Sequence, residues 1–586
     1  MRKTKIICTL GPACEDEKTM RKMLEAGMDV ARFNFSHGDH AVQLERIKKI
    51  RKLSKEMNKY IACLLDTKGP EIRIGTFKED KIELKAGAEF TLTSREIEGD
   101  ENAVSVSFKD LPKDVYAGAK ILIDDGLVEL NVLAVTDTEI KCKVINGGAI
   151  GNRKGVNIPG ITISMPYISE KDRADMVFGI ENGYDFIAAS FTRNEKDILD
   201  IKKILDEYQC KHIKIIAKIE NAEGVINIDN ILRVSDGIMV ARGDMGVEIP
   251  LEDVPVLQKQ LINKAYNAGK IVITATQMLE SMIHNPRPTR AETTDVATAI
   301  YDGTSAIMLS GETAAGQYPV ETVQTMSRIA LRAEEDINYK KRFKDNEITE
   351  IPDVTNAISH AACTTAYDLG AAAIIAVTKT GMSARMVSKY RPSIPIIGSS
   401  PDPFVLRQLN MSWGVTPIEV QNKSNADELF EAVANKAKEQ GLLKNGDLVV
   451  IMAGVPLKVA GTTNLLKVHI VGDVLVKGTG INNMCAAANL CVANTENEAI
   501  QTFQRGDILV IPKTSNKILD LMKQASGIIT EEGGSDSHAA IVGMALDIPV
   551  LVGAVGATQI LKSGTRIKLD AQRGLVCNEN REGKDA

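Results

Sequence analysis

The sequence lacks three features that would each place it in a special class of protein. Its nine cysteines are scattered, with no CxxC pair, which excludes a disulfide-stapled scaffold and indicates reduced, mostly buried thiols. No apolar stretch approaches the length of a membrane span, and Gly11 and Pro12 cut the first apolar run too early for a signal peptide. A net charge of -6 argues against a nucleic-acid backbone or an anionic membrane as the main partner. We therefore expect a cytoplasmic chain without nucleic-acid or membrane partners.

What remains is an ordinary globular composition. The 586 residues are 44% hydrophobic, 25% charged and only 4% aromatic. This length predicts three or four domains with ample chain for several large cores.

Short apolar runs that end in glycine or polar residues recur along the first half of the chain, mostly 24 to 35 residues apart. Helical patterns such as residues 16–27 fill the gaps. Eight strand-then-helix units predict an α/β fold of the (β/α)₈ TIM-barrel type, with an open doubly wound sheet as the alternative. The runs are residues 5–11, 30–38, 60–69, 186–191, 215–221, 237–244, 271–277 and 306–313.

The third and fourth runs are separated by about a hundred residues of a different pattern. Residues 81–94 and 119–133 alternate apolar and polar positions between frequent turns, which is typical of a small all-β domain. We expect an inserted β-barrel lid at 70–170 that closes over a site on the barrel, which occupies 1–69 and 171–344.

The second half of the chain predicts two further α/β domains, at 345–474 and 475–586. In the first, residues 378–385 end a strand and begin a helix, which is a good seat for an anion. A second loop rich in glycine and threonine, residues 453–464, faces this seat in the prediction. Ordinary helix capping is the alternative for either loop. The anion seat consists of Thr378, Lys379, Thr380, Gly381 and Ser383.

The stretch 213–246 holds two apolar runs that each stop on charge. The first ends with Lys218 and Glu220, and the second ends with Asp244. In parallel strands these ends meet, and two carboxylates beside a lysine suit a magnesium ion that bridges phosphate oxygens. A salt-bridged strand end is the alternative interpretation.

The other strand ends add cations and hydroxyls to the same mouth of the barrel, where barrel enzymes carry out their chemistry. This inventory suits a highly phosphorylated substrate pair, whose charge Arg32, Arg73 and Lys218 would neutralise. Neutral and singly charged oxygens form a softer set that suits a monovalent cation. That set is Asn34, Ser36, Asp66 and Thr67.

From residue 1 to about 470 the chain resembles pyruvate kinases. The resemblance rests on motifs in matching order and spacing: CTLGP at 8–12, RFNFSHG at 32–38, LDTKGPEIR at 65–73, KGVNIPG at 154–160, KIEN at 218–221, ARGDMGVEIP at 241–250, TATQMLESMIHNPRPTRAE at 274–292 and MLSGETAAGQYP at 308–319.

The resemblance implies phosphoryl transfer from phosphoenolpyruvate to ADP in the last step of glycolysis, giving ATP and pyruvate, with Mg²⁺ (or Mn²⁺) and K⁺. It implies that Lys218 steadies the phosphoryl group, that Glu220 and Asp244 bind Mg²⁺, and that Thr276 and Ser310 lie near the path that protonates the enolate. The phosphoenolpyruvate contacts it implies are Arg32, Lys218, Gly243, Asp244 and Thr276. The implied nucleotide contacts are Asn34, Ser36, His37, Arg73 and Lys154, and the implied K⁺ ligands are Asn34, Ser36, Asp66 and Thr67.

Two further properties follow from the resemblance alone. A glutamate at the position of Glu71 goes with K⁺ dependence in this family. The third domain is regulatory in the family, so residues 378–384 are expected to bind a sugar phosphate or a nucleotide monophosphate. A homotetramer is expected as well.

The last domain resembles the phosphohistidine domain of enzymes that use phosphoenolpyruvate, and Thr530, Gly533, Gly534, Ser537 and His538 match its motif. His538 is therefore a candidate phosphohistidine. Two departures from the motif favour a structural or regulatory module instead. Glu532 replaces the usual basic residue, and Gly543 with Met544 replaces the usual alanine-arginine pair, although a phosphohistidine needs nearby cations.

Two other function classes remain as alternatives. A dikinase-like enzyme that uses His538 as a carrier would need an ATP-grasp domain, for which the chain has no spare length. A non-catalytic scaffold built on a dead kinase would be expected to have lost Lys218, Glu220 or Asp244, and all three are present.

Overall fold

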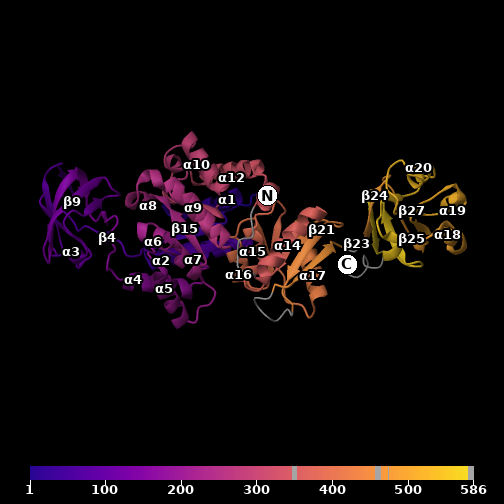
Figure 1. Ribbon diagram of the computed structural model, residues 1–586, viewed down its shortest axis with the longest axis horizontal. Helices are drawn as coiled ribbons and strands as arrows, with labels where there is room; N and C mark the ends of the chain where they lie inside the picture. Colours follow the sequence, from indigo (N-terminus) through magenta and orange to yellow (C-terminus); the bar gives the residue numbers. More distant parts are fainter. Residues whose placement is uncertain (346–352, 456–462, 473, 579–586) are drawn as a thin grey trace. The chain divides into compact units, whose positions relative to one another are not determined.

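The computed structural model describes residues 1–345, 353–455, 463–472 and 474–578 (Figure 1). By internal contacts it divides into two compact units. The first holds residues 1–363, 375–421 and 452–465, and the second holds 364–374, 422–451 and 466–586. No helix among the described residues is both long enough and apolar enough to cross a bilayer.

The first unit contains the predicted closed barrel of eight parallel strands, in the order β1-β17-β16-β15-β14-β13-β3-β2. Each of the eight apolar runs supplies one strand, and nearly every strand residue is buried, as expected where helices cover the outer face and side chains fill the interior. The strands are β1 Lys5–Thr9, β2 Val30–Asn34, β3 Ala62–Asp66, β13 Phe186–Ala189, β14 Lys214–Ile219, β15 Gly237–Ala241, β16 Ile271–Ala275 and β17 Ala306–Leu309.

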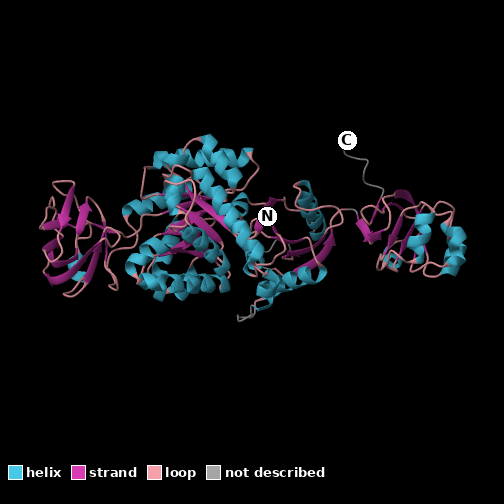
Figure 2. Cartoon of the chain, turned by 90° about the horizontal axis from the view of Figure 1, so that it is seen from above, coloured by secondary structure: helices cyan, strands magenta, loops and turns pink. Residues whose placement is uncertain are grey.

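Helices connect the strands and surround them (Figures 1 and 2). The principal ones are α1 Glu17–Ala26, α2 His40–Glu56, α4 Glu170–Glu181, α5 Glu195–Glu207, α7 Ile228–Val234, α9 Val254–Asn267, α10 Arg290–Asp302 and α12 Pro319–Asp336.

Helix α1 shows how the local sequence sets these boundaries. The Asp16 side chain accepts a hydrogen bond from the Thr19 N–H and caps the start. Gly27 has a φ of 119° and ends the helix in the left-handed conformation, which a side chain would disfavour. Between them, Met20, Met23 and Leu24 are buried at the helical spacing that packs one face on the barrel. The sequence therefore fixes both the ends of α1 and its orientation.

The insertion between β3 and β13 is rich in strands (Figure 2). It forms a seven-stranded sheet in the order β4-β12-β8-β9-β10-β6-β7, a two-stranded sheet of β11 and β5, and its own apolar core. Its strands are β4 Ile72–Arg73, β5 Lys81–Leu84, β6 Glu89–Thr93, β7 Ala103–Ser105, β8 Lys120–Ile123, β9 Val128–Val135, β10 Glu139–Asn146, β11 Gly148–Gly151 and β12 Gly155–Asn157.

A third region contains a five-stranded sheet in the order β20-β19-β18-β21-β22. Its strands are β18 Ala373–Val377, β19 Ile396–Ser400, β20 Val415–Glu419, β21 Leu448–Ala453 and β22 Leu465–Ile470. Its helices are α14 Val354–Leu369, α15 Met382–Lys389, α16 Pro403–Leu409 and α17 Ala426–Glu439.

The last region, within the second unit, is an eight-stranded sheet in the order β23-β30-β29-β25-β26-β27-β28-β24. Its strands are β23 Val474–Lys477, β24 Thr479–Gly480, β25 Cys485–Val492, β26 Ile508–Ile511, β27 Gly527–Thr530, β28 Val550–Val552, β29 Arg566–Asp570 and β30 Leu575–Asn578. Helix α20 (His538–Ala545) follows its strand β27 (Gly527–Thr530). The α/β fold class with its TIM barrel is thus confirmed, whereas the domain boundaries stay predictions.

Candidate active site

The residues that end β2, β3, β13 and β14 form a buried polar cluster at the carboxyl mouth of the barrel. Strand register places Asn34 beside Asp66, because β2 and β3 are adjacent and parallel. Arg32 donates from Nε to Asp66 Oδ2 (2.6 Å) and from a terminal nitrogen to Thr9 Oγ1 (2.9 Å). The predicted convergence of strand ends is present in the fold.

Lys218 lies at the centre of this cluster. Its Nζ is 3.1 Å from Asp66 Oδ1, 2.8 Å from Ser190 Oγ and 3.0 Å from Glu220 Oε1. Burial alone would lower the pKa of Lys218, but the carboxylates of Asp66 and Glu220 outweigh burial and raise it. The ammonium is therefore fully charged at neutral pH.

Asp66 is the cluster's permanent anion. It is 1% exposed, and burial alone would raise its pKa, but Arg32 and Lys218 outweigh that effect and lower it. Its two oxygens thus hold both cations in fixed positions.

Glu220 has the opposite character. It is 1% exposed, and burial raises its pKa to about 7 despite the neighbouring Lys218, with Asp244 adding to the rise. Its Oε2 accepts a hydrogen bond from the Phe191 N–H (2.5 Å), whereas Oε1 is buried and accepts no hydrogen bond, although the Lys218 ammonium is in ion-pair range. A buried carboxylate oxygen without a hydrogen-bond donor is suited to bind a cation.

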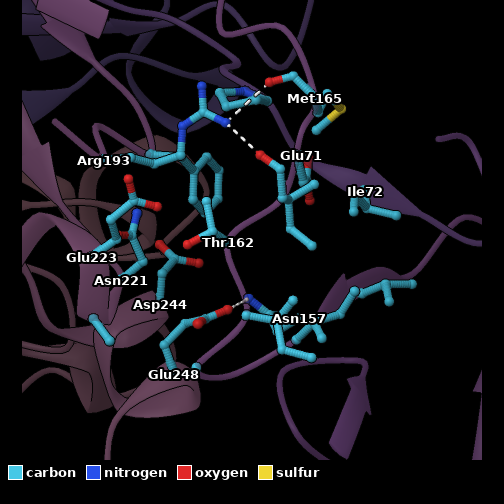
Figure 3. Close-up of a pocket in the computed structure, with 18 of the residues that line it drawn as sticks. Glu71, Ile72, Asn157, Thr162, Met165, Arg193, Asn221, Glu223, Asp244 and Glu248 are labelled. Carbon is cyan, nitrogen blue, oxygen red and sulfur yellow. Dashed lines mark hydrogen bonds between the residues drawn. The ribbon is translucent and has the colours of Figure 1, made fainter. Parts of the chain in front are cut away.

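Asp244 lies in the first turn of α8 (Arg242–Glu248), directly after β15. It lines a cavity of about 1130 Å³, counting the solvent at its mouth, with Glu71 and Asp125. Figure 3 shows Asp244 beside Glu248, whose Oε1 accepts a hydrogen bond from Asn157 (3.0 Å). The carboxylates of Glu220 and Asp244 would occupy two positions around a Mg²⁺ ion and leave the others to substrate oxygens. This fits the preference of Mg²⁺ for one or two protein carboxylates together with phosphates.

Thr276 follows β16 with a φ of 67°, a rare conformation for a β-branched residue. Its hydroxyl accepts a hydrogen bond from the Gly243 N–H (2.8 Å) and donates one to the Ala275 carbonyl (2.7 Å). These bonds tie the end of β16 to the start of α8. Strain of this kind is characteristic of functional sites.

The remaining predicted residues surround this centre. Ser310 follows β17, and its N–H donates to Glu312 Oε2 (2.6 Å). Arg73 pairs with Glu71, and Lys154 pairs with Asp124 at 2.9 Å. Ser36 and His37 are exposed in the turn after β2, where Asn34 Oδ1 accepts from the Ser36 N–H (3.0 Å).

The predicted K⁺ ligands supply oxygens near β2 and β3, but several are already engaged. The Thr67 hydroxyl donates to the Ala188 carbonyl (3.2 Å) and accepts from the Ser190 N–H (3.1 Å). Among the described residues no group of three or more His, Cys, Asp or Glu side chains converges on one point. The amide oxygen of Asn34 and the hydroxyl oxygens of Ser36 and Thr67 are neutral and suit a weakly charged cation better than a second divalent one.

Ser190 was missed in the sequence. Its hydroxyl donates to the Thr67 carbonyl (2.7 Å), lies 3.0 Å from Asp66 Oδ1 and accepts from Lys218. The available signal was its position as the polar residue within the fourth apolar run, directly after β13, where polar residues lie at the mouth.

Two predicted sites lie outside the barrel, the effector loop and His538. The effector loop is held by hydrogen bonds of its own. Gly381 has a φ of 79°, and its N–H donates to Thr378 Oγ1 (3.0 Å), while Lys379 and Thr380 are exposed. Ser383 Oγ lies 2.6 Å from Thr463 Oγ1. Residues 456–462 of the predicted facing loop lie outside the described residues.

His538 begins helix α20. Its Nδ1 lies 2.9 Å from Thr514 Oγ1, and its Nε2 lies 3.0 Å from Asn516 Oδ1. Both ring nitrogens are therefore held by neutral partners.

Three family models match the chain: the pyruvate kinase barrel domain over 1–323, the pyruvate kinase alpha/beta domain over 356–469, and the mobile domain of PEP-utilising enzymes over 503–574. A pyruvate kinase of Geobacillus stearothermophilus is 50% identical over 98% of both chains, and one of Bacillus licheniformis is 50% identical over 98% of this chain and 99% of its own. A crystal structure of a pyruvate kinase from Cryptosporidium parvum superposes with a TM-score of 0.77 at 43% identity, covering 80% of this chain and 96% of the other. The chemistry of the barrel mouth agrees with these similarities, which show that the chain belongs to the pyruvate kinase family, a family of phosphotransferases.

Proposed function

We propose that this enzyme transfers the phosphoryl group of phosphoenolpyruvate to ADP, with the Lys218 cluster as the place of transfer. The observation that carries the proposal is the position of the Lys218 ammonium, within 3.1 Å of both Asp66 at the end of β3 and Glu220 at the end of β14. A buried cation held in this way needs no reorganisation when charge develops on a transferring phosphoryl group.

In the proposed reaction the bond between phosphorus and the enol oxygen of phosphoenolpyruvate breaks as a terminal oxygen of ADP bonds to phosphorus. Lys218 and Arg32 stabilise the phosphoryl oxygens during this exchange. The enolate that leaves then gains a proton at its terminal carbon and becomes pyruvate. Thr276 and Ser310 follow β16 and β17 at the same mouth, and we assign to their hydroxyls the role of guiding that proton.

Glu220 and Asp244 are the proposed ligands of Mg²⁺ or Mn²⁺. When bound, the divalent ion supplies positive charge that bridges and neutralises phosphate oxygens. The buried Oε1 of Glu220, which accepts no hydrogen bond, is the protein's own support for this assignment.

Asn34, Ser36, Asp66 and Thr67 are the proposed K⁺ ligands, next to Arg32. The proposed nucleotide contacts are Asn34, Ser36, His37, Arg73 and Lys154. Arg73 and Lys154 are each about 40% exposed, so both can turn from Glu71 and Asp124 toward phosphate oxygens.

Regulation is a further part of the proposal. The effector loop consists of Thr378, Lys379, Thr380 and Gly381, which precede α15, and Ser383 in its first turn. It offers hydroxyls, backbone N–H groups and one cation to a phosphorylated effector. A sugar phosphate or a nucleotide monophosphate fits that chemistry. A cytoplasmic homotetramer completes the proposed enzyme.

The tail is proposed to be an accessory module. The loop before His538 carries Glu531, Glu532 and Asp536, and negative charge next to a phosphohistidine opposes its formation.

The test is a lactate-dehydrogenase-coupled assay with phosphoenolpyruvate, ADP, Mg²⁺ and K⁺, run with and without AMP, ribose 5-phosphate and fructose 1,6-bisphosphate. The same assay on a chain ending at residue 474 shows whether the tail is needed. We expect activity in both chains and activation by one effector. No pyruvate formation by the full chain would refute the proposed reaction.

A further inference from the structure

A second cavity lies at the opposite end of the barrel, where β16 and β17 begin. It is a small cavity that opens to solvent, and it lies between these strands and helix α15. Both its walls belong to the first compact unit. The carboxyl mouth with Lys218 and Glu220 is at the other end of the same strands, so this cavity is separate from the active site.

The charged side chains that line this cavity are all basic. Its lining includes Lys270, Arg385, Lys389 and Arg391, and among the described residues that line it none is acidic. Burial lowers the pKa of Lys270 and of Arg385, and it lowers the pKa of Arg391 to about 10. The cavity therefore gathers basic side chains in a partly desolvated place.

The neighbouring carboxylates are engaged elsewhere. Asp236, the nearest acid to Lys270 and Arg385, accepts the Ile215 N–H and pairs with Lys214 at 3.2 Å. Glu334, which faces Arg391, accepts the N–H groups of Lys3 and Thr4. Neither side chain lines the cavity.

Two buried polar atoms in the lining have no hydrogen-bond partner. Arg391 and Ser412 are each 3% exposed, and both Arg391 Nε and Ser412 Oγ are without a partner. The other end of the Arg391 guanidinium donates to the Gly303 carbonyl (3.1 Å) and to Ser305 Oγ (3.0 Å). Buried donors are almost always satisfied in native proteins, so an unpaired pair in one cavity indicates a missing acceptor.

Arg391 is also held in an unusual way. Its φ is 47°, and its guanidinium lies 4.7 Å from the centroid of the Trp413 ring and 5.5 Å from that of Tyr266. Aromatic faces and the carbonyl end of α15 offset part of its charge, but they leave Nε unpaired. The positive φ and the aromatic contacts hold this cation in place in the lining of the cavity.

We propose that this cavity, the basal cavity, binds a small tetrahedral oxyanion, either inorganic phosphate or the phosphate group of a small metabolite. Arg391 Nε and the Ser412 hydroxyl would donate to it from within, and Lys270 and Arg385 would neutralise it from the mouth. The lining residues Lys270 and Ser305 belong to the barrel, whereas Arg385 and Arg391 belong to the α/β region. The bound anion would therefore contact both regions. The inference does not depend on the proposed reaction.

Trp413 makes the proposal directly measurable. It is the single tryptophan of the chain, and it lines the basal cavity. An anion that engages the Arg391 guanidinium changes the field at the indole ring, so intrinsic fluorescence of the full-length protein reports occupancy. The titrant is sodium phosphate at constant ionic strength, with sodium chloride as the blank.

We expect a saturable fluorescence change with phosphate. Lys270→Gln and Arg385→Gln, at the cavity mouth, should each weaken phosphate affinity about tenfold, since each removes a charge-assisted contact. Lys259→Gln is the matched control. It removes an exposed cation of helix α9, outside the basal cavity and the proposed effector loop, and should leave the phosphate affinity unchanged within about twofold.

The opposite pattern overturns the proposal. A phosphate response that disappears in Lys379→Gln but persists in Lys270→Gln and Arg385→Gln places the anion in the effector loop. No fluorescence response of the unmodified protein up to saturating phosphate also overturns it. Sulfate and glycerol phosphate distinguish the sources, because a site for free oxyanion takes sulfate and rejects the ester, whereas a site for a metabolite's phosphate takes the ester.

Discussion

The Lys218 ammonium and Glu220 Oε1 lie 3.0 Å apart at the carboxyl end of β14. The two residues are separated by Ile219, which is fully buried, and alternate residues of a strand project to the same side. One strand end thus supplies a cation and a carboxylate to a single point, and the closed barrel adds Asp66 from β3, 3.1 Å from the same ammonium.

Lys218→Met should lower kcat by about 10³-fold or more and leave phosphoenolpyruvate binding close to unchanged, because the charge acts chiefly in the transition state. Lys214→Met is the control. Lys214 begins the same strand and pairs with Asp236, so its loss should change kcat less than about twofold. Steady-state kinetics and equilibrium binding of phosphoenolpyruvate check both, and near-normal turnover in Lys218→Met would refute the role assigned to this lysine.

Affinity for Mg²⁺ should depend on pH through Glu220. Burial raises the pKa of Glu220 to about 7 in the metal-free protein, so below that pH a proton must leave before the metal binds. We expect Mg²⁺ affinity to fall by up to about tenfold for each pH unit below 7 and to level off above it. Calorimetric titration in two buffers of different ionisation enthalpy measures the released proton.

Glu220→Gln is the comparison for that experiment. The amide keeps the shape of the side chain but cannot take up or release the proton, so Mg²⁺ binding should weaken and its proton release should decline. An identical pH dependence in Glu220→Gln would show that another group controls metal binding.

Ser190→Ala should lower kcat/KM by about tenfold to a hundredfold. The hydroxyl joins Asp66, Lys218 and the Thr67 carbonyl, and its removal leaves a buried charged cluster underpaired. Ser190 is a positioning residue, so Ser190→Thr should recover part of the loss if the methyl group is accommodated. An unchanged pH profile and full activity in Ser190→Ala would contradict this role.

Thr276→Val should reduce kcat/KM by about tenfold or more, whereas Thr276→Ser should retain most activity. Valine keeps the size and the β-branch but leaves the Gly243 N–H, now bonded at 2.8 Å, without an acceptor. Thermal unfolding of both variants separates a local loss from a global one. Equal kinetics for the two variants would indicate that the hydroxyl does not matter.

His538→Ala should leave pyruvate formation within about twofold of the unmodified enzyme. Its ring nitrogens contact Thr514 and Asn516 in the same region, and no step of the proposed reaction uses them. The coupled assay checks this directly. Loss of turnover in a folded His538→Ala protein would revive the carrier hypothesis.

The sequence by itself determined the order of the strands and helices and most of the barrel mouth. Apolar runs five or so residues long, each ending on polar residues, specify buried parallel strands, and their carboxyl ends must meet. Local signals such as Asp16 and Gly27 determined helix ends, because capping is decided within a few residues. For this reason the sequence alone identifies Lys218, Glu220 and Asp244 as candidate active-site residues.

Only the tertiary structure decided which groups touch. The ion pair of Lys218 with Asp66 spans 152 positions, and the role of Ser190 depends on the register between β3 and β13. The basal cavity has no local signature at all, because Lys270 and Arg391 are ordinary surface-type residues in the sequence. Folding brings these two cations to the same cavity and partly removes them from water, and only then do their charges act together.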